Sequence, residues 1–126
     1  MNFMTCQVVG RGEDVTLAHP NFTIPLKADQ IRRLNGAAVG GTVRMGMRPD
    51  ALTISTQPSA ELAITGQVFV NELLGGDMIV EVEVGEARVR VRTSPDFPGA
   101  PGEPCYLTVD RDRWHVFDSN DGHAYF

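Results

Sequence analysis

The 126-residue sequence contains one lysine, one tryptophan and two cysteines, and these low counts exclude several kinds of protein. The net charge is -5, whereas phosphate-rich partners are normally bound by clustered Lys and Arg, so nucleic acid is not an expected partner. Cys6 and Cys105 are far apart, and neither has a Cys or His neighbour at metal-ligand spacing. We therefore expect two small buried thiols in a reducing compartment, with no disulfide and no metal.

Long hydrophobic runs are also absent. No apolar stretch approaches the roughly 20 residues that a membrane helix needs. Residues 1–5 have neither the basic start nor the continuous apolar segment of a signal peptide. Because 42% of the residues are hydrophobic and 21% are charged, the chain can bury the core of one ordinary domain, and we expect a soluble, cytoplasmic protein.

Short segments of alternating apolar residues, separated by glycine, proline and other turn formers, run through the whole chain. This pattern predicts an all-β fold, most simply a β-barrel, with one short helix at 28–34 that ends at Asn35-Gly36. The predicted strands are Cys6–Val9, Val15–Leu17, Phe22–Pro25, Gly41–Met47, Leu52–Ser55, Ile64–Leu73, Met78–Val84, Ala87–Thr93, Cys105–Val109 and Trp114–Phe117.

The segment "MIVEVEVGEARVRVR" predicts a β-hairpin whose two-residue loop is Gly85-Glu86. In that register one face is apolar, and the other places Glu83 opposite Arg88 and Glu81 opposite Arg90. The arginines could form a phosphate-binding stripe. A solvated sheet face is the favoured interpretation, because acids lie opposite two of them.

The two halves of the sequence resemble each other. "CQVV" at 6–9 matches "GQVF" at 66–69, and "GTVRMGMRPDALTI" at 41–54 matches "GEPCYLTVDRDRWHVF" at 102–117. This alignment places Arg48 on Arg111 and Ile54 on Phe117. Units of about 60 residues are marginal alone, so we expect halves 1–57 and 62–126 to intertwine and complete each other, joined through 55–60.

No catalytic, cofactor-binding or metal-binding motif is evident. The glycines of "VGRGEDV" and "NGAAVGGT" lack the lysine of a phosphate-binding loop. The three histidines are isolated, and the aspartates at 110–121 lack the spacing of a calcium loop and are typical of turns. The aromatic residues lie within apolar alternation, so a core or a partner interface is favoured over base stacking.

Four motifs, in order, resemble one family. They are "MNFM" at 1–4, "VRMGMRPDAL" at 43–52, "ITGQVFVNELLGGD" at 64–77 and "RWHVFDSNDGHAYF" at 113–126. Together they are similar to the C-terminal regulatory region, the transport-associated OB domain, of ATP-binding-cassette importer ATPase subunits of the maltose and glycerol-3-phosphate type. Small departures are Asp50 for the usual Glu, Met47 for Ile and Val116 for Leu. The ATPase domain, with its Walker A lysine, signature motif and switch histidine, is not in this sequence.

The resemblance implies an oligonucleotide/oligosaccharide-binding (OB)-like β-barrel. It also implies a non-catalytic regulatory and dimerisation domain, in a subunit that imports a sugar or a related small solute. It implies three partners: an ATPase domain of the same or a longer subunit, a second copy of the subunit, and a possible regulatory protein. Contact with the inner membrane would be indirect, through the transporter. The motif residues, expected to be structural or interfacial, are Arg48, Pro49, Asp50, Glu72, Leu73, Gly75, His115, Phe117, Asp118 and Gly122, and Trp114 is the expected exposed partner contact.

Two alternatives remain from the sequence. The first is a module that binds an oxyanion such as molybdate or sulfate through backbone amides and hydroxyls. The second is a nucleic-acid-binding OB barrel. Arg48-Pro49-Asp50 itself is expected to be a turn after a buried strand, because Pro49 favours extended geometry before it and Asp50 is suited to accept backbone N–H groups.

Overall fold

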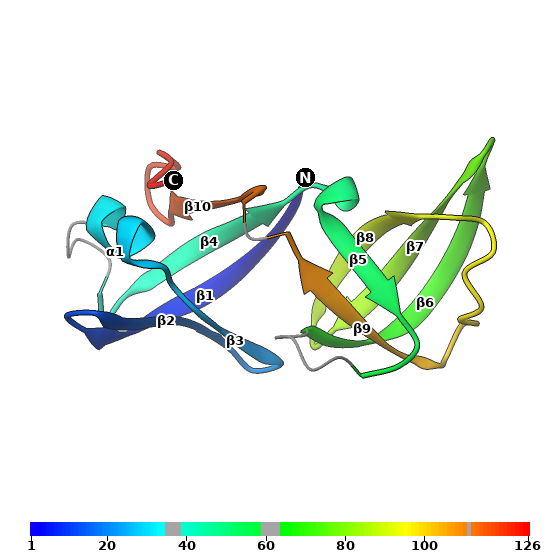
Figure 1. Ribbon diagram of the computed structural model, residues 1–126, viewed down its shortest axis with the longest axis horizontal. Helices are drawn as coiled ribbons and strands as arrows, with labels where there is room; N and C mark the ends of the chain where they lie inside the picture. The colour runs from blue at the N-terminus through cyan, green and yellow to red at the C-terminus, as the bar shows by residue number, and fades with distance from the viewer. Residues whose placement is uncertain (35–38, 59–63, 111) are drawn as a thin grey trace.

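The structure is a computed structural model that describes residues 1–34, 39–58, 64–110 and 112–126. Its elements are ten strands, one α-helix and one 3-10 turn, η1 (Figure 1). They are β1 (Asn2–Arg11), β2 (Asp14–His19), β3 (Phe22–Pro25), α1 (Ala28–Leu34), β4 (Thr42–Met47), η1 (Pro49–Ala51), β5 (Leu52–Ser55), β6 (Ile64–Leu74), β7 (Asp77–Val84), β8 (Ala87–Thr93), β9 (Pro104–Val109) and β10 (Trp114–Asp118).

The strands form two antiparallel five-stranded sheets with the same internal order. One sheet runs β10-β4-β1-β2-β3 and the other runs β5-β9-β6-β7-β8. Four strands of the first sheet, β4, β1, β2 and β3, occupy the same positions as β9, β6, β7 and β8 of the second sheet. The two sheets therefore correspond strand for strand. The fifth strand of each sheet is exchanged, because β5 joins the later strands and β10 returns to the earlier ones. The expected intertwining of two β units is therefore present.

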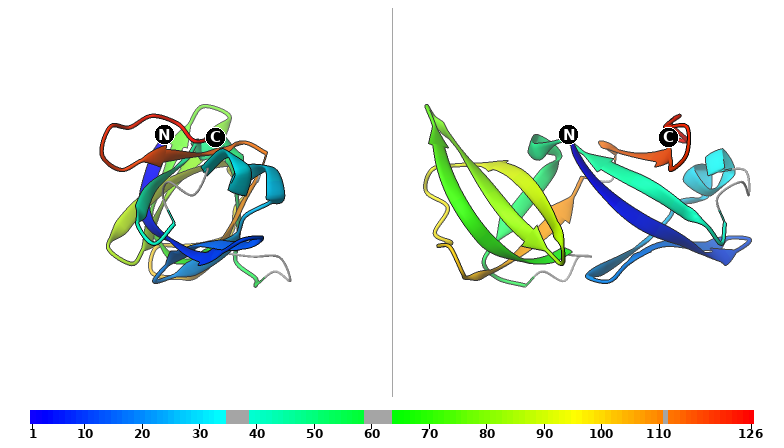
Figure 2. Two further views of the ribbon diagram at one scale, coloured as in Figure 1. Left: turned by 90° about the vertical axis from the view of Figure 1, so that its left-hand side faces the viewer. Right: turned by 180° about the vertical axis from the view of Figure 1, so that it is seen from behind.

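The sheets make two lobes that lie side by side along the long axis (Figures 1 and 2). We call β1–β4, β10 and α1 the first lobe, and β5–β9 the second lobe. In the second lobe the edge strands β5 and β8 are in contact, so the sheet curls back on itself as a barrel. One connected cluster of buried apolar side chains runs through both lobes. No helix in the described ranges is long and apolar enough to span a bilayer.

The predicted strands and the helix at 28–34 are confirmed, with small differences at their ends. The largest difference is in β1, which begins at Asn2 instead of Cys6. Asn2, Met4, Cys6 and Val8 are buried in alternation, but the polar Asn2 concealed the start of this pattern in the sequence. The expected helix stop at Asn35-Gly36, the match of Arg48 to Arg111, and part of the 55–60 connection lie outside the described residues.

The predicted hairpin is also confirmed in its register. Glu83 pairs with Arg88 and Glu81 with Arg90 across β7 and β8, and Gly85 turns the chain with a φ of 60°. The valines of both strands that face inward are fully buried. One buried apolar face therefore fixes the register, since a slip by one residue would move every valine to solvent.

Candidate functional surfaces

The turn at Arg48-Pro49-Asp50 connects β4 of the first lobe to β5 of the second. Arg48 is extended, with φ -75° and ψ 149°, as expected before a proline, and Pro49 begins η1. The turn is closed by a hydrogen bond from the Ala51 N–H to the Arg48 carbonyl oxygen at 3.0 Å. The motif is thus the point at which the chain passes between the lobes.

Asp50 has a different partner from the backbone groups expected from the sequence. Its carboxylate lies 3.0 Å from the Arg113 guanidinium, which also donates to the Asp50 carbonyl oxygen at 3.2 Å. Arg113 stands just before β10, the strand that returns to the first lobe. The ion pair therefore ties together the two crossings between lobes, although both side chains are about half exposed and the pair is individually weak.

The arginine-rich face of β8 is neutralised by acids, as the favoured interpretation expected, but by other acids than those directly opposite. Arg92 binds Asp77 at 2.6 Å, and Arg88 lies 3.9 Å from Glu81, which is two residues from its cross-strand partner Glu83. The Arg88 guanidinium also stacks on the Phe69 ring, 3.4 Å from its centroid. Arg88 and Arg92 therefore already have partners within the protein, so this face is not a free phosphate-binding stripe.

The β6–β7 hairpin extends beyond the rest of the second lobe (Figure 1). Its end carries Glu72, Leu73 and Gly75 of the family motif, and Gly75 makes the turn with a φ of 59°. Leu73 and Leu74 are 66% and 50% exposed, and Phe69 and Val70 on the same strand are also exposed. This apolar hairpin end is the largest group of exposed large hydrophobic side chains on one element of the described chain.

A second exposed cluster lies on the outer face of the first lobe. The Phe3 and Phe117 rings meet edge to face with centroids 5.9 Å apart, and the Arg44 guanidinium lies over Phe3 at 4.3 Å. Gly46 lies beneath them, where a Cβ atom would meet Phe117 at 2.7 Å and the Met1 sulfur at 2.8 Å. The ring centroids of Phe117 and His115 lie 6.0 Å apart. Phe117 therefore belongs to an aromatic patch on β1, β4 and β10.

The expectation that Trp114 is exposed is wrong. Trp114 is only 3% exposed, since its alternation on β10 points the indole inward, where it packs edge to face on Phe126 at 5.4 Å. Its indole nitrogen is buried and has no hydrogen-bond acceptor among the residues that the structure describes. Of the aromatic residues near the end of the chain, Phe117 and His115 keep exposed surface, and Trp114 does not.

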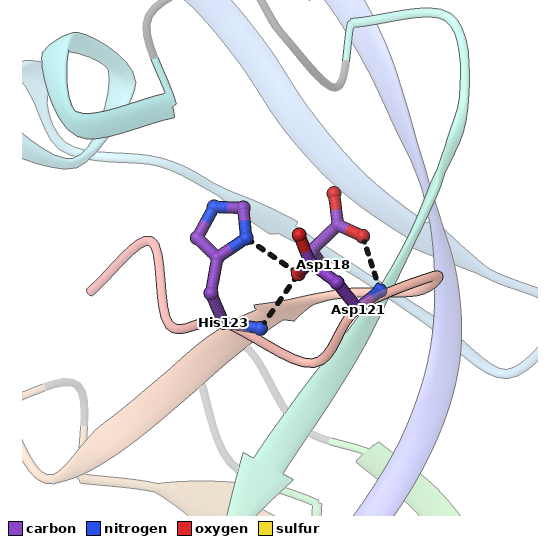
Figure 3. Close-up of side chains that lie close together, drawn as sticks. All are labelled: Asp118, Asp121 and His123. Atoms are coloured by element: carbon purple, nitrogen blue, oxygen red, sulfur yellow. Dashed lines mark hydrogen bonds and ion pairs between the residues drawn. The ribbon is translucent and has the colours of Figure 1, made fainter.

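Asp118, Asp121 and His123 lie together in the turn after β10 (Figure 3). One atom from each lies within 4.8 Å of the others, a spacing at which a metal ion could be held. The atoms already have partners, however: Asp118 accepts the Asn120 and Asp121 N–H groups and the Tyr125 hydroxyl, and Asp121 accepts from His123. With Gly122 at a φ of 78°, the cluster is a side-chain-capped turn, as the sequence predicted for these aspartates.

The hydrogen bonds in this turn lower the pKa values of its two carboxyl groups. Backbone donation from Asp121, followed by the Tyr125 hydroxyl and the Asn120 N–H, lowers the pKa of Asp118 to about 2. Donation by the backbone and side chain of His123 lowers the pKa of Asp121. Both aspartates are thus held in the ionised form, which accepts hydrogen bonds best.

The remaining nucleophilic and basic groups do not converge. Cys6 and Cys105 are free and buried, and burial raises their pKa values to about 12 and about 11. His19 stacks on Phe22 and accepts the Asn21 N–H, and its burial lowers its pKa. The structure places His19, His115 and His123 at separate points, so none of them completes a nucleophile–base pair among the described residues.

Sequence reasoning missed one structural site, at Asn2. Its side chain is 8% exposed, and both of its amide atoms bind the backbone of Arg90 in the other lobe. The sequence did contain a signal for this site, because Asn2 continues the alternating pattern of inward residues at 4, 6 and 8. An amide at an inward position needs specific hydrogen-bond partners.

The two sheets, each with the same strand order and with one strand exchanged between them, define a class of paired, intertwined β-barrel modules. Residues 45–117 match the TOBE domain family and residues 1–52 match the MalK OB fold domain. The chain therefore belongs to the TOBE domain family, and the resemblance drawn from the four motifs is confirmed.

Individual relatives agree. The chain is 29% identical over 119 residues to the sulfoquinovosyl glycerol transport ATP-binding protein SmoE of Agrobacterium fabrum, covering 94% of the chain and 32% of that protein. It is 29% identical over 83 residues to the sn-glycerol-3-phosphate import ATP-binding protein UgpC of Pectobacterium atrosepticum, covering 66% and 23%. The chain thus spans at most about a third of the length of these relatives.

A solved structure shares the fold. The cytoplasmic molybdate-binding protein ModG superposes with a TM-score of 0.68 at 13% sequence identity, covering 91% of this chain and 94% of that one. At this identity the likeness shows the fold alone. It is consistent with the paired, intertwined arrangement of the two sheets.

Proposed function

We propose that this chain is the regulatory and dimerisation domain of the ATP-binding subunit of a bacterial ABC importer for a sugar or a related small solute. The observation that carries the proposal is the alignment of 94% of the chain with about a third of a transport ATP-binding protein. The TOBE and MalK OB matches cover the same barrels that the structure displays. The domain itself performs no reaction. It is cytoplasmic and reaches the inner membrane only through the transporter.

In this role the domain holds two ATPase subunits together while their nucleotide sites open and close. A regulatory protein can bind the domain with different affinities when the nucleotide sites are open and when they are closed. The difference between its two binding free energies is then the largest shift it can cause in the open–closed equilibrium. The exchange of β5 and β10 joins the two lobes at two chain crossings, which suits a domain that supports two subunits.

The apolar hairpin end is the proposed contact with the ATP-binding part of a subunit. Leu73 and Leu74 stand on a two-stranded ribbon that projects from its lobe, and large apolar groups grouped in this way are typical of interaction sites. The aromatic patch around Phe117 is the proposed contact with a second copy or a regulator. The two surfaces lie on different lobes, so both partners could be bound together.

A chimaera tests the proposal. The chain replaces the matching third of SmoE, and solute uptake and ATPase activity are measured in cells and in the purified complex. We expect uptake to be retained, and to be lost when Leu73→Ser and Leu74→Ser are introduced, because the hairpin no longer packs on the ATP-binding part. Val9→Ser, at another exposed apolar side chain on β1, is the matched control and should leave uptake unchanged.

The outcomes separate two claims. A chimaera that is soluble and hydrolyses ATP, yet never supports uptake, contradicts the proposed function. Full uptake with both leucines replaced contradicts the proposed contact of the hairpin with the ATP-binding part, but it does not contradict the proposed function. Sedimentation of the 126-residue chain adds a third result, since a strict monomer at high concentration would show that the chain does not dimerise unaided.

The alternatives from the sequence remain predictions with direct tests. Calorimetric titration with molybdate and sulfate tests the oxyanion module, and no heat with either would end it. Retention on single-stranded DNA that falls with salt tests nucleic-acid binding, which the net charge of -5 disfavours.

A further inference from the structure

A pocket of about 320 Å³ lies where α1 meets β10 and the Phe126 ring. Figure 1 shows these segments together at one end of the first lobe. The second lobe has no helix at the corresponding place between β8 and β9, so the pocket is peculiar to the first lobe. Neither the β6–β7 hairpin nor the aromatic residue Phe3 contributes to its walls.

The pocket walls carry balanced charges. Lys27 and Arg33 are cationic, and Asp29 and Asp112 are anionic. Lys27 and Asp112 form a pair at 3.4 Å. Arg33 and Asp29 are four residues apart on α1, and neither has an ion-pair partner within the described part of the chain. One positive and one negative group are thus left for a ligand.

One buried donor in the same walls lacks an acceptor. The indole nitrogen of Trp114 is buried and has no hydrogen-bond partner among the described residues. Gln30, beside it in the pocket wall, is 6% exposed, and its Oε1 atom accepts the Lys27 N–H at 2.9 Å. Buried polar groups are normally satisfied, and an oxygen of a ligand in this pocket would supply the acceptor that the Trp114 indole lacks.

We propose that this pocket binds a small zwitterion, an α-amino acid with an apolar side chain. Its carboxylate accepts hydrogen bonds from Arg33 and Trp114. Its ammonium group pairs with Asp29, and its side chain lies against the rings of Trp114 and Phe126. A simple anion would meet the unpaired Asp29 carboxylate, and a simple cation would meet Arg33, so a molecule that carries both charges fits best. This site is independent of the proposed function.

The only tryptophan of the chain gives the test a single reporter. The indole N–H resonance of the 126-residue chain is followed by ¹H–¹⁵N NMR during titration with L-leucine. The same titration is repeated with 4-methylpentanoate, which lacks the ammonium group, and with 3-methylbutylamine, which lacks the carboxylate. We expect a saturable shift with L-leucine, and binding at least about tenfold weaker with either analogue, the loss expected for one charge-assisted contact.

Two substitutions on α1 provide matched variants. Arg33→Gln should weaken L-leucine binding about tenfold or more, and Arg32→Gln, an equivalent change at an exposed arginine outside the pocket, should leave it unchanged. Asp29→Asn should weaken L-leucine but not 4-methylpentanoate. Absence of any saturable shift with L-leucine overturns the proposal. So does equal binding of 4-methylpentanoate, which would make the pocket an anion site, or an equal effect of both arginine variants, which would make the response non-specific.

Discussion

The side-chain amide of Asn2 forms two hydrogen bonds with the backbone of Arg90, donating to its carbonyl oxygen at 2.7 Å and accepting its N–H at 2.9 Å. Asn2 begins β1 in the first lobe, and Arg90 lies in the middle of β8 in the second. The amide pairs with the backbone as a neighbouring strand would. The lobes are thereby joined by specific polar contacts as well as by the strand exchange.

Replacing Asn2 by Ala should lower the free energy of unfolding by about 1–3 kcal/mol, because the Arg90 N–H and C=O lose their partners at a partly buried site. Urea denaturation followed by circular dichroism measures this change. Asn120→Ala is the matched control, since only the backbone N–H of Asn120 is used in the described structure. Equal stability of the two variants would contradict the role given to Asn2.

Gly66→Ala should destabilise the protein by about 1–3 kcal/mol, because overpacking forces the surrounding structure to move. A Cβ at Gly66 would lie 2.6 Å from a Val82 methyl and 2.8 Å from the Glu83 carbonyl oxygen, and that backbone atom is fixed by the β-ladder. Gly76→Ala is the control, because nothing lies within 4 Å of its Cβ position. Thermal unfolding of both variants measures the difference, and a tolerated Gly66→Ala would refute the tight packing of β6 on β7.

The turn held by Asp118 should loosen in acid. The pKa of Asp118 is about 2 in the folded state, against roughly 3.9 in an unfolded chain, so its stabilisation is complete above the unfolded value and is lost as pH falls through about 2. NMR titration of its carboxyl carbon measures the folded pKa. Tyr125→Phe removes the hydroxyl that donates to Asp118 Oδ2 at 2.7 Å, and the pKa should then rise toward its ordinary value. An ordinary pKa in the unaltered chain would contradict this account of the turn.

Both thiols should be inert in the native protein at pH 8. Burial raises the pKa of Cys6 to about 12 and that of Cys105 to about 11, so almost no reactive thiolate is present. Titration with a chromogenic disulfide reagent should detect neither thiol before denaturation and both afterwards. Rapid reaction of either thiol without denaturant would show that its lobe opens locally.

Periodicity was sufficient for most of the fold. The alternating valines of β7 and β8 predicted both the strands and their register, since one buried face allows one pairing only. Ala28–Leu34 was predicted with its observed bounds. The start of β1 was missed because Asn2 is polar, and its inward position becomes understandable only when Arg90 of the other lobe is beside it.

The candidate sites were less predictable. The sequence pointed to Trp114 as a surface contact, but its place on β10 turns the indole inward. The charges on β8 were expected to pair directly across the hairpin, whereas long side chains reach a different acid, as Arg88 reaches Glu81. The pocket at α1 could not be predicted, because its walls come from segments about 80 residues apart in the sequence.

The sequence by itself determined the β class, the strand register of the hairpin, the family and the turn at Arg48-Pro49-Asp50. These depend on local periodicity and on the fixed geometry of proline and glycine. Only the tertiary structure decided which sheet β5 and β10 join, which side chain satisfies the Arg90 backbone and that the buried Trp114 indole N–H in the α1 pocket has no partner among the described residues. Those features depend on contacts between segments that are distant in the sequence. The contacts form, and stabilise the protein, only after the two lobes have exchanged strands and packed together.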